Sequence, residues 1–343
     1  MRTTIKDIAN YTGLSITTIS LVLNGKGDKI PQKTKEIVFQ AAKELNYSPN
    51  KVAIGLVKKR TYSIGLILPD ISNVFFSNLA KGVEDACRTA GWNLFLCNTN
   101  DSHKSDMQYI QVMADKGVDG ILYVMAAESD EKRVQECIHL MENLNIPYIM
   151  IDRYIYGENL VSLATNHKKG GYLATKYLIE LGHKRIACIT GPKNLVCSQN
   201  RLLGYKEALE EAGIPFKKEL IYHGQYTIES GREAYKYLAD KEYSAIFAFN
   251  DMSAFGVYKE LVMQGIRVPD EISLVGYDNI FFCDLLDVPL TTIKQPVYEM
   301  GKQAVEVLVD EERMKQRKGN PIFIEPELVI RKSTAPCNIK ISP

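Results

Sequence analysis

The feature that most constrains the fold is a regular alternation, from residue 61 onwards, of short apolar runs with stretches of helical spacing. The runs are SIGLILPD, WNLFLCNTND, GILYVM and YIMID, followed by RIACITG, LIYHG, AIFAFND and ISLVGYD. Apolar strands that alternate with helices are typical of parallel sheets whose faces are covered by crossover helices. The runs fall into two comparable sets, before and after about residue 162. The pattern therefore predicts an α/β body of two doubly wound lobes.

Polar and aromatic side chains gather where several of these predicted strands end. Ligands of doubly wound sheets bind beyond the carboxyl ends of the strands, so the cleft between the lobes is the predicted site. Carboxylate, guanidinium and amide groups suit the paired donors and acceptors of a sugar, and aromatic rings suit its apolar faces. The candidates are Asn73, Phe75, Phe76, Asp152, Arg153, Arg201, Asn250, Asp278 and Gln295.

Each candidate also has a purely structural explanation. Asn250 could cap the helix that follows it, and Asp278 could be a turn residue. Phe75 and Phe76 could pack in the core, and Arg153 could lie on the surface. The residues alone leave these alternatives open, although their coincidence at strand ends favours a binding site.

The first 46 residues predict three helices. Apolar positions in TIKDIANYTGLSITTISLVLNG recur at helical spacing on both sides of Gly13, which predicts two short helices joined by a tight turn. Ser15 is a suitable N-cap for the second helix, which is expected to end at Asn24–Gly25. A third helix, from about Gln32 to Asn46, is expected to close the core with Ile37, Val38, Ala41, Ala42 and Leu45.

This small head is predicted to be a helix-turn-helix, which would place its second helix in the major groove of DNA. With Ile19, Val22 and Leu23 facing inward, Ile16, Thr17, Ser20 and Leu21 are left to contact bases. The alternative is an ordinary three-helix bundle without a nucleic-acid role.

The charge distribution favours the DNA-binding interpretation. The net charge is +1, but residues 1–60 hold eleven Lys or Arg against four Asp or Glu, and the remainder holds 31 against 37. A head near +7 on a body near −6 is expected when one small module meets phosphate. The N-terminus does not read as a secretory signal, so a cytoplasmic protein is expected. The seven scattered cysteines indicate neither a zinc site nor disulfides, and no metal or cofactor is expected.

At this point the chain resembles the LacI/GalR family of bacterial regulators. The matching strings are TIKDIANYTGLSITTISLVLNG, AAKELNYSPN and VAIGL, and the resemblance extends to about residue 334. It implies that Asn50 to Val57 form a hinge helix that orders on DNA, with Leu56 as a wedge in the minor groove. Lys58, Lys59 and Arg60 would either neutralise phosphates or form a solvated link. The DNA contacts implied are Thr4, Ser15, Ile16, Thr17, Thr18, Ser20, Leu21, Asn24, Tyr47, Asn50, Ala53, Leu56 and Lys58.

Two departures from the family pattern affect DNA recognition. Ile16, Thr17 and Leu21 stand where members usually have polar or bulky groups, and the two aliphatic side chains can contact thymine methyls but cannot donate to guanine. Ile54 stands where an arginine is common. An operator sequence is therefore not transferable from other members.

The body resembles the type I periplasmic sugar-binding proteins, and its strings SNVFF, IDR, QNRLLGY, FNDMSAFG, VGYDN and TTIKQP resemble ribose-type repressors especially. The resemblance assigns the nine candidate residues to the effector, with Tyr226 as a second aromatic wall. It implies a head at 1–48, a hinge at 49–60, a first lobe at 61–162 and 293–321, and a second lobe at 163–292 and 322–336. Residues 296–311 would form a helix that returns to the first lobe.

The expected function is a repressor in which a small sugar, with a ribose-like pentose favoured, controls binding to a near-palindromic operator. No heptad repeat follows Pro336, so a homodimer is the expected assembly, with no membrane partner. Alternatives within the family are a purine-responsive repressor and a regulator controlled by a phosphorylated carrier protein. A transport-type sugar receptor is less favoured because of the basic head. An enzyme is not expected, since the chain holds none of the common nucleotide-binding or nucleophile motifs.

Overall fold

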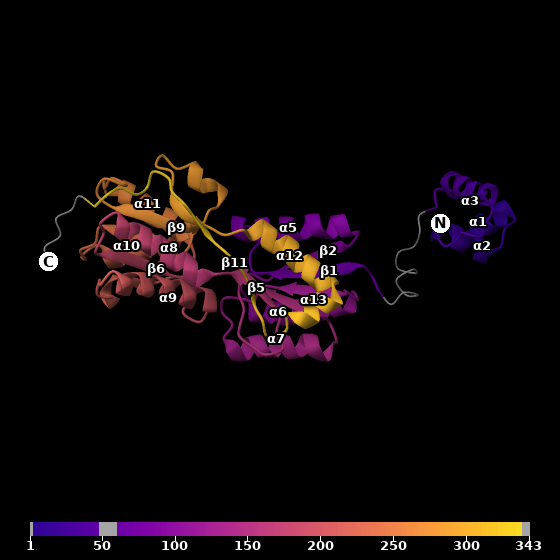
Figure 1. The fold of residues 1–343 in the computed structure, drawn as a ribbon, viewed down its shortest axis with the longest axis horizontal. Helices are drawn as coiled ribbons and strands as arrows, with labels where there is room; N and C mark the ends of the chain where they lie inside the picture. Colours follow the sequence, from indigo (N-terminus) through magenta and orange to yellow (C-terminus); the bar gives the residue numbers. More distant parts are fainter. Residues whose placement is uncertain (1–2, 48–59, 338–343) are drawn as a thin grey trace. The chain divides into compact units, whose positions relative to one another are not determined.

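The computed structural model describes residues 3–47 and 60–337, which fall into two units that divide after Thr61 (Figure 1). The predicted hinge helix lies outside the described residues. So do four of the implied DNA contacts, Asn50, Ala53, Leu56 and Lys58. Each unit has its own apolar core.

The first unit contains the three predicted helices, α1 (Ile5–Thr12), α2 (Ile16–Leu23) and α3 (Gln32–Glu44). Thr4 begins α1 with a capping box, in which its backbone N–H donates to Asp7 and its hydroxyl accepts from the Asp7 N–H. Gly13 ends α1 at φ 70°, a conformation that glycine adopts without strain. The Ser15 hydroxyl accepts from the Thr18 N–H at 3.1 Å, which confirms it as the N-cap of α2.

The core of this unit is small and follows the predicted helical faces with one exception. Its buried members are Ile8, Ile19, Val22, Val38 and Ala41. Ile37 was expected among them, but 43% of it is exposed. One residue corresponds to about 100° around a helix, so Ile37 lies at the margin of the stripe centred on Val38. This prediction was wrong because periodicity does not define how wide the covered face is.

The second unit contains the two predicted lobes, each built on a six-stranded sheet. The sheet of the first lobe has the order β11-β5-β4-β3-β1-β2, and all of its pairs are parallel. Its strands are β1 (Ser63–Leu68), β2 (Asn93–Asn98), β3 (Gly120–Tyr123), β4 (Tyr148–Ile151), β5 (Ser162–Thr165) and β11 (Ile322–Ile324).

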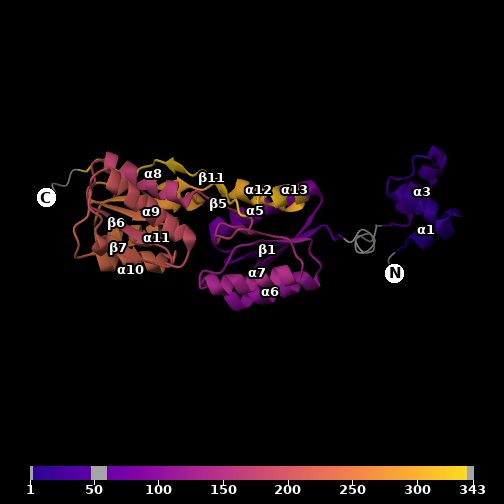
Figure 2. The same cartoon turned by 60° about the horizontal axis from the view of Figure 1, so that its bottom comes forward.

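Helices cover both faces of this sheet (Figure 2). One face packs against α5 (Val74–Ala90) and α12 (Val297–Val309), which form one buried cluster with β1 and β3. The other face packs against α6 (His103–Asp115) and α7 (Glu131–Asn143). The short helix α13 (Glu311–Gln316) follows α12. Helix α12 thus returns to the first lobe, as predicted.

The sheet of the second lobe has the order β12-β10-β9-β8-β6-β7, and only β12 is antiparallel to its neighbour among the described strands. One face packs against α8 and α9, and the other against α10 and α11. The strands are β6 (Ile186–Thr190), β7 (Ile221–His223), β8 (Ala245–Ala248), β9 (Ser273–Asp278), β10 (Thr291–Lys294) and β12 (Glu327–Val329). The helices are α8 (His167–Glu180), α9 (Val196–Glu211), α10 (Ile228–Leu238) and α11 (Asp251–Met263), with short 3₁₀ turns η1 (Lys218–Leu220) and η2 (Phe281–Asp284).

The chain crosses between the lobes two to three residues later than predicted. Strands β5 and β11 pair within the first sheet, and β10 pairs within the second, so the crossings follow Thr165, Lys294 and Ile324. The predicted lobe boundaries at 162, 292 and 321 therefore cut through or stop short of these strands. An apolar run predicts a strand, but only its hydrogen bonds show which sheet it joins.

Within residues 3–47 and 60–337, no helix is long and apolar enough to cross a bilayer. Five of the seven cysteines are buried, namely Cys87, Cys137, Cys188, Cys197 and Cys283.

Candidate ligand-binding site

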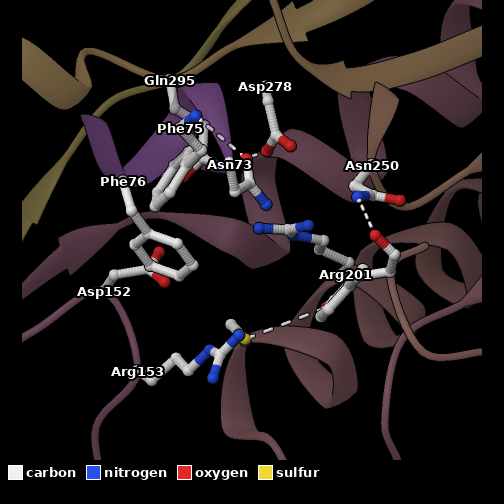
Figure 3. Close-up of a pocket in the computed structure, with 11 residues that line it drawn as sticks. Asn73, Phe75, Phe76, Asp152, Arg153, Arg201, Asn250, Asp278 and Gln295 are labelled. Carbon is white, nitrogen blue, oxygen red and sulfur yellow. Dashed lines mark hydrogen bonds between the residues drawn. The ribbon is translucent and has the colours of Figure 1, made fainter. Parts of the chain in front are cut away.

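All ten residues that the sequence predicts for effector binding line a single cavity, to which both lobes contribute (Figure 3). The cavity lies where strands β4, β8, β9 and β10 reach their carboxyl ends. Its lining is Asn73, Phe75, Phe76, Asp152, Arg153, Arg201, Tyr226, Asn250, Asp278 and Gln295, together with Cys197.

The first lobe supplies an aromatic wall. The Asn73 side chain caps α5 by accepting from the Phe75 N–H at 3.0 Å, which places the two phenylalanines in the first turn of the helix. Their rings meet edge to face, with centroids 5.1 Å apart, and both are buried. Both rings belong to the core of the lobe and also line the cavity. Core packing and a place in the ligand cavity are therefore compatible for these two residues.

Asp152 and Arg153 follow β4 directly. Asp152 has φ 62°, an uncommon conformation for a residue other than glycine, and its Oδ1 is buried without a hydrogen-bond partner. Arg153 is also buried, donates to the Met125 carbonyl at 3.1 Å, pairs with Asp101 and lies over the Phe76 ring. Burial raises the pKa of Asp152, an effect that Arg153 and Arg201 partly offset. Arg153 is therefore a fixed part of the site and not a surface residue.

The second lobe supplies a cation and a second ring. Arg201 extends from α9, donates to the Phe249 carbonyl and lies 3.8 Å from the centroid of Tyr277. The centroid of the Tyr226 ring lies 5.6 Å from Cζ of the same guanidinium. Asn250 caps α11 by accepting from the Ser253 N–H at 3.0 Å, and its amide donates to the Tyr226 carbonyl at 2.8 Å. The capping explanation for Asn250 is thus correct, and the same side chain also lines the cavity.

Asp278 and Gln295 end neighbouring strands β9 and β10. The Gln295 amide donates to Asp278 Oδ1 at 2.7 Å, and its own Oε1 is buried without a partner. Burial raises the pKa of Asp278 well above its usual range, with Arg201 opposing that effect and Asp251 adding to it. Two buried oxygens that belong to cavity-lining residues, Asp152 Oδ1 and Gln295 Oε1, therefore have no hydrogen-bond donor. Unsatisfied buried acceptors are costly, so they indicate a hydroxyl-bearing or amine-bearing ligand.

The sequence reasoning missed two residues. Cys197 lines the cavity one helical turn before Arg201 on α9, and this i, i+4 spacing would have placed both on one face. His167 is buried beside Arg201, to which it is hydrogen-bonded, without lining the cavity. Nothing in its sequence neighbourhood indicates that position.

The head presents the predicted reading face of α2 to solvent. Ile16 is 49% exposed and Leu21 is 38% exposed, while Ile19 and Val22 fill the core. Other implied DNA contacts hold the head together. Ser20 accepts from the Asn24 amide at 2.7 Å through its carbonyl, and Tyr47 packs against the core. Thr4, Ser15 and Thr18 take part in the caps described above, and Thr17 is exposed.

The described residues contain no cluster of three or more His, Cys, Asp or Glu side chains that could hold a metal ion. A two-lobed body with a ligand cavity at the strand ends, preceded by a helix-turn-helix, defines a class of ligand-responsive DNA-binding proteins. Comparison with known families agrees. Residues 61–325 match the model of periplasmic binding proteins and the sugar binding domain of the LacI family, and residues 4–50 match that of bacterial regulatory proteins of the lacI family.

The chain belongs to the LacI family and is a DNA-binding transcriptional regulator. It is 38% identical over 341 residues to the HTH-type transcriptional regulator DegA of Bacillus subtilis, covering 98% of this chain and 100% of the relative. It is 37% identical over 337 residues to the transcriptional repressor PurR of Vibrio vulnificus, and the match covers 98% of this chain and 99% of the relative.

Solved structures of regulators share the fold. A lac repressor dimer bound to operator and the anti-inducer ONPF superposes with a TM-score of 0.86 at 26% identity, covering 98% of this chain and 100% of the other. A LacI family regulator from Enterococcus faecium with bound ribose superposes with a TM-score of 0.71 at 30% identity, and the match covers 80% of this chain and 100% of the other.

Proposed function

We propose that this regulator is a repressor controlled by a small sugar, with a ribose-like pentose favoured, bound in the cavity between its lobes. The observation that carries the proposal is the pair of buried acceptors without donors, Asp152 Oδ1 and Gln295 Oε1. Sugar hydroxyls both donate and accept, so one ring could satisfy these oxygens and also accept from Arg153 or Arg201.

The aromatic lining supports the same ligand class. Phe75 and Phe76 form one apolar wall (Figure 3), and Tyr226 also lines the cavity. Arg153 lies over the Phe76 ring and Arg201 over the Tyr226 ring. A sugar ring has apolar C–H faces and a polar rim, which this arrangement complements. The ribose bound to the related Enterococcus faecium regulator adds support for a pentose.

A purine is the second candidate, because PurR of Vibrio vulnificus is 37% identical along nearly the whole chain. A flat base would stack against the same aromatic side chains and would take hydrogen bonds from the same polar groups. The two carboxylates, Asp152 and Asp278, favour a ligand with several donors, as a sugar has.

Control by a phosphorylated carrier protein predicts instead that free sugars bind weakly.

On the DNA side, α2 would enter the major groove of a near-palindromic operator. Ile16 and Leu21 would contact thymine methyls, with Thr17 and Ser20 as hydrogen-bonding neighbours. The ligand would alter operator affinity by binding one lobe arrangement more tightly than another, which is a difference in free energy between two states of the body.

A homodimer would match the symmetry of such an operator, and the body offers apolar surface for one. In the second lobe, Phe281 and Leu285 on and beside η2 are 66% and 62% exposed, and Phe282 lies between them. In the first lobe, the edge strand β2 exposes Phe95 and Leu96. Exposed apolar patches and unpaired strand edges commonly mark interfaces.

The test is titration calorimetry of the full protein with D-ribose, other pentoses and hexoses, and the bases adenine, guanine and hypoxanthine. We expect D-ribose to bind, and Asp152→Asn to weaken that binding because the carboxylate acceptor is lost. Asp240→Asn is the matched control, since Asp240 is exposed and pairs only with the adjacent Lys241 among the described contacts. Tight binding of a purine without binding of any sugar would establish the second candidate and refute the first.

Operator DNA provides the second arm of the test. The same ligand should change the affinity of the full protein for its operator, and operator should change the affinity for the ligand by the same factor. Equal ligand affinities with and without operator would rule out allosteric control.

A further inference from the structure

A buried histidine lies behind the ligand cavity, at the place where the chain first crosses between the lobes. His167 is the first residue of α8 and follows β5 by two positions. Its ring is in contact with the second lobe through Tyr277, whose hydroxyl is 3.3 Å from Nδ1. It does not line the cavity, so any effect on the ligand must pass through its neighbours.

The hydrogen bonds of His167 determine which ring nitrogen carries the proton. Arg201 Nε donates to His167 Nδ1 at 3.2 Å, and a guanidinium can donate but cannot accept. Nδ1 is therefore the acceptor. Burial and the positive charge of Arg201 lower the pKa of His167 well below its usual range, so the ring is neutral. A neutral ring with an accepting Nδ1 carries its proton on Nε2.

That Nε2–H group is buried and has no hydrogen-bond partner. The acceptor that faces it is Asp152 Oδ1, at 3.9 Å, which is also buried and without a partner. A normal N–H···O hydrogen bond is about 2.9 to 3.0 Å long, so a relative movement of about 1 Å would join the two atoms. The two unsatisfied groups are therefore complementary. Because a carboxylate oxygen has two lone pairs, Asp152 Oδ1 can accept from His167 and from a ligand hydroxyl together.

The two partners of His167 belong to different lobes. Asp152 follows β4 of the first sheet, whereas Arg201 lies on α9, which packs on the second sheet. Both also line the ligand cavity. A single ring thus faces one ligand-lining residue from each lobe.

We propose that His167 is a positioning residue that joins the lobes across the back of the cavity, accepting from Arg201 through Nδ1 and donating to Asp152 through Nε2–H as the lobes close. It would orient both side chains toward the ligand without touching the ligand itself. The ligand part of this inference rests on the proposed sugar-binding function, but the hydrogen-bonded arrangement does not.

The first experiment requires no ligand. Long-range ¹H–¹⁵N spectra of the full, histidine-labelled chain at pH 7 report the tautomer of each of the five histidines, and His167→Gln identifies the resonance. We expect the Nε2–H tautomer, with an Nε2–H resonance that moves in Asp152→Asn. Asp101→Asn is the matched control, because Asp101 is a carboxylate of the same lobe that pairs with Arg153 and accepts from the Ala127 N–H. An Nδ1–H tautomer, or a resonance insensitive to Asp152→Asn, would overturn the proposal.

The second experiment measures D-ribose binding by calorimetry in two variants. The amide of His167→Gln can accept from Arg201 and donate to Asp152, so we expect affinity near that of the wild type. His167→Leu can do neither, and we expect affinity to fall about tenfold to a hundredfold.

The control is His183→Leu. His183 is also buried and bonded at both ring nitrogens, to Ser244 and Ser273, but it lies outside the cavity region. We expect this variant to lower Tm without changing the affinity of the folded protein for D-ribose. Equal losses of affinity in His167→Gln and His167→Leu would show a packing role only and would refute the proposal. If the wild type binds no sugar, the proposed function fails, and the spectra still decide the role of His167.

Discussion

Gly191 provides a sharp test of how the second lobe shapes the cavity. It directly follows β6 and lies under the ring of Tyr226. A Cβ added at this position would be 2.0 Å from Tyr226 Cζ and 2.4 Å from two further ring carbons. The three nearest atoms all belong to this one side chain. The closest clash that Gly191→Ala creates is therefore with this one ring.

The size of the effect follows from these distances. Ordinary van der Waals contact begins at about 3.4 Å, so the ring must move by about 1.4 Å. Because the end of a side chain can yield, we expect a loss of only about 1 kcal/mol in the free energy of unfolding. An aromatic contact contributes about 0.5 to 1.5 kcal/mol, so displacing this wall should weaken D-ribose binding by about 2- to 13-fold.

The assay is a double-mutant cycle by titration calorimetry. Tyr226→Ala removes the ring, so adding Gly191→Ala in that background should have no further effect on D-ribose affinity. Thermal unfolding of the four proteins would show that each is folded. If the two substitutions lower affinity additively, the ring does not lie over Gly191 and the reasoning fails.

Three further predictions concern stability and DNA binding. Burial raises the pKa of Asp106 to about 6 from 3.8, so the stability contributed by its neutral form is present below pH 4 and is lost as pH rises through 6. The unfolding free energy of Asp106→Asn minus that of the wild type should therefore rise by about 3 kcal/mol from pH 4 to pH 8. Urea titrations that give the same difference at both pH values would contradict this. A Cβ on Gly204 would be 1.9 Å from the backbone oxygen of Lys168, which cannot rotate away, so Gly204→Ala should cost about 1 to 3 kcal/mol. An unchanged midpoint in urea would show that α8 and α9 are not this close. Residues 1–60 alone should bind operator weakly and with a steep salt dependence, and an affinity equal to that of the full protein would disprove this expectation.

Much of the architecture follows from the sequence because it depends on local patterns. Apolar periodicity identified the three helices of the head, and turn and capping residues such as Gly13 and Ser15 marked their ends. Strand ends followed by polar residues indicated the cavity, since parallel strands bring their carboxyl ends to one edge of a sheet. Asp152, Asn250 and Asp278 were found in this way, and resemblance to a family added Tyr226.

Other features depend on contacts between segments far apart in the chain, and only the tertiary structure decided them. Strands β5 and β11 join the first sheet because of their hydrogen bonds, which no local pattern records. Ile37 is exposed because three short helices cover only part of α3. Folding brings His167 between Asp152, 15 residues before it in the chain, and Arg201, 34 residues after it. The sequence by itself determined the elements, the two lobes and the residues at the strand ends. The unpaired Asp152 oxygen and the buried His167 ring that faces it arise from the packing of one lobe against the other.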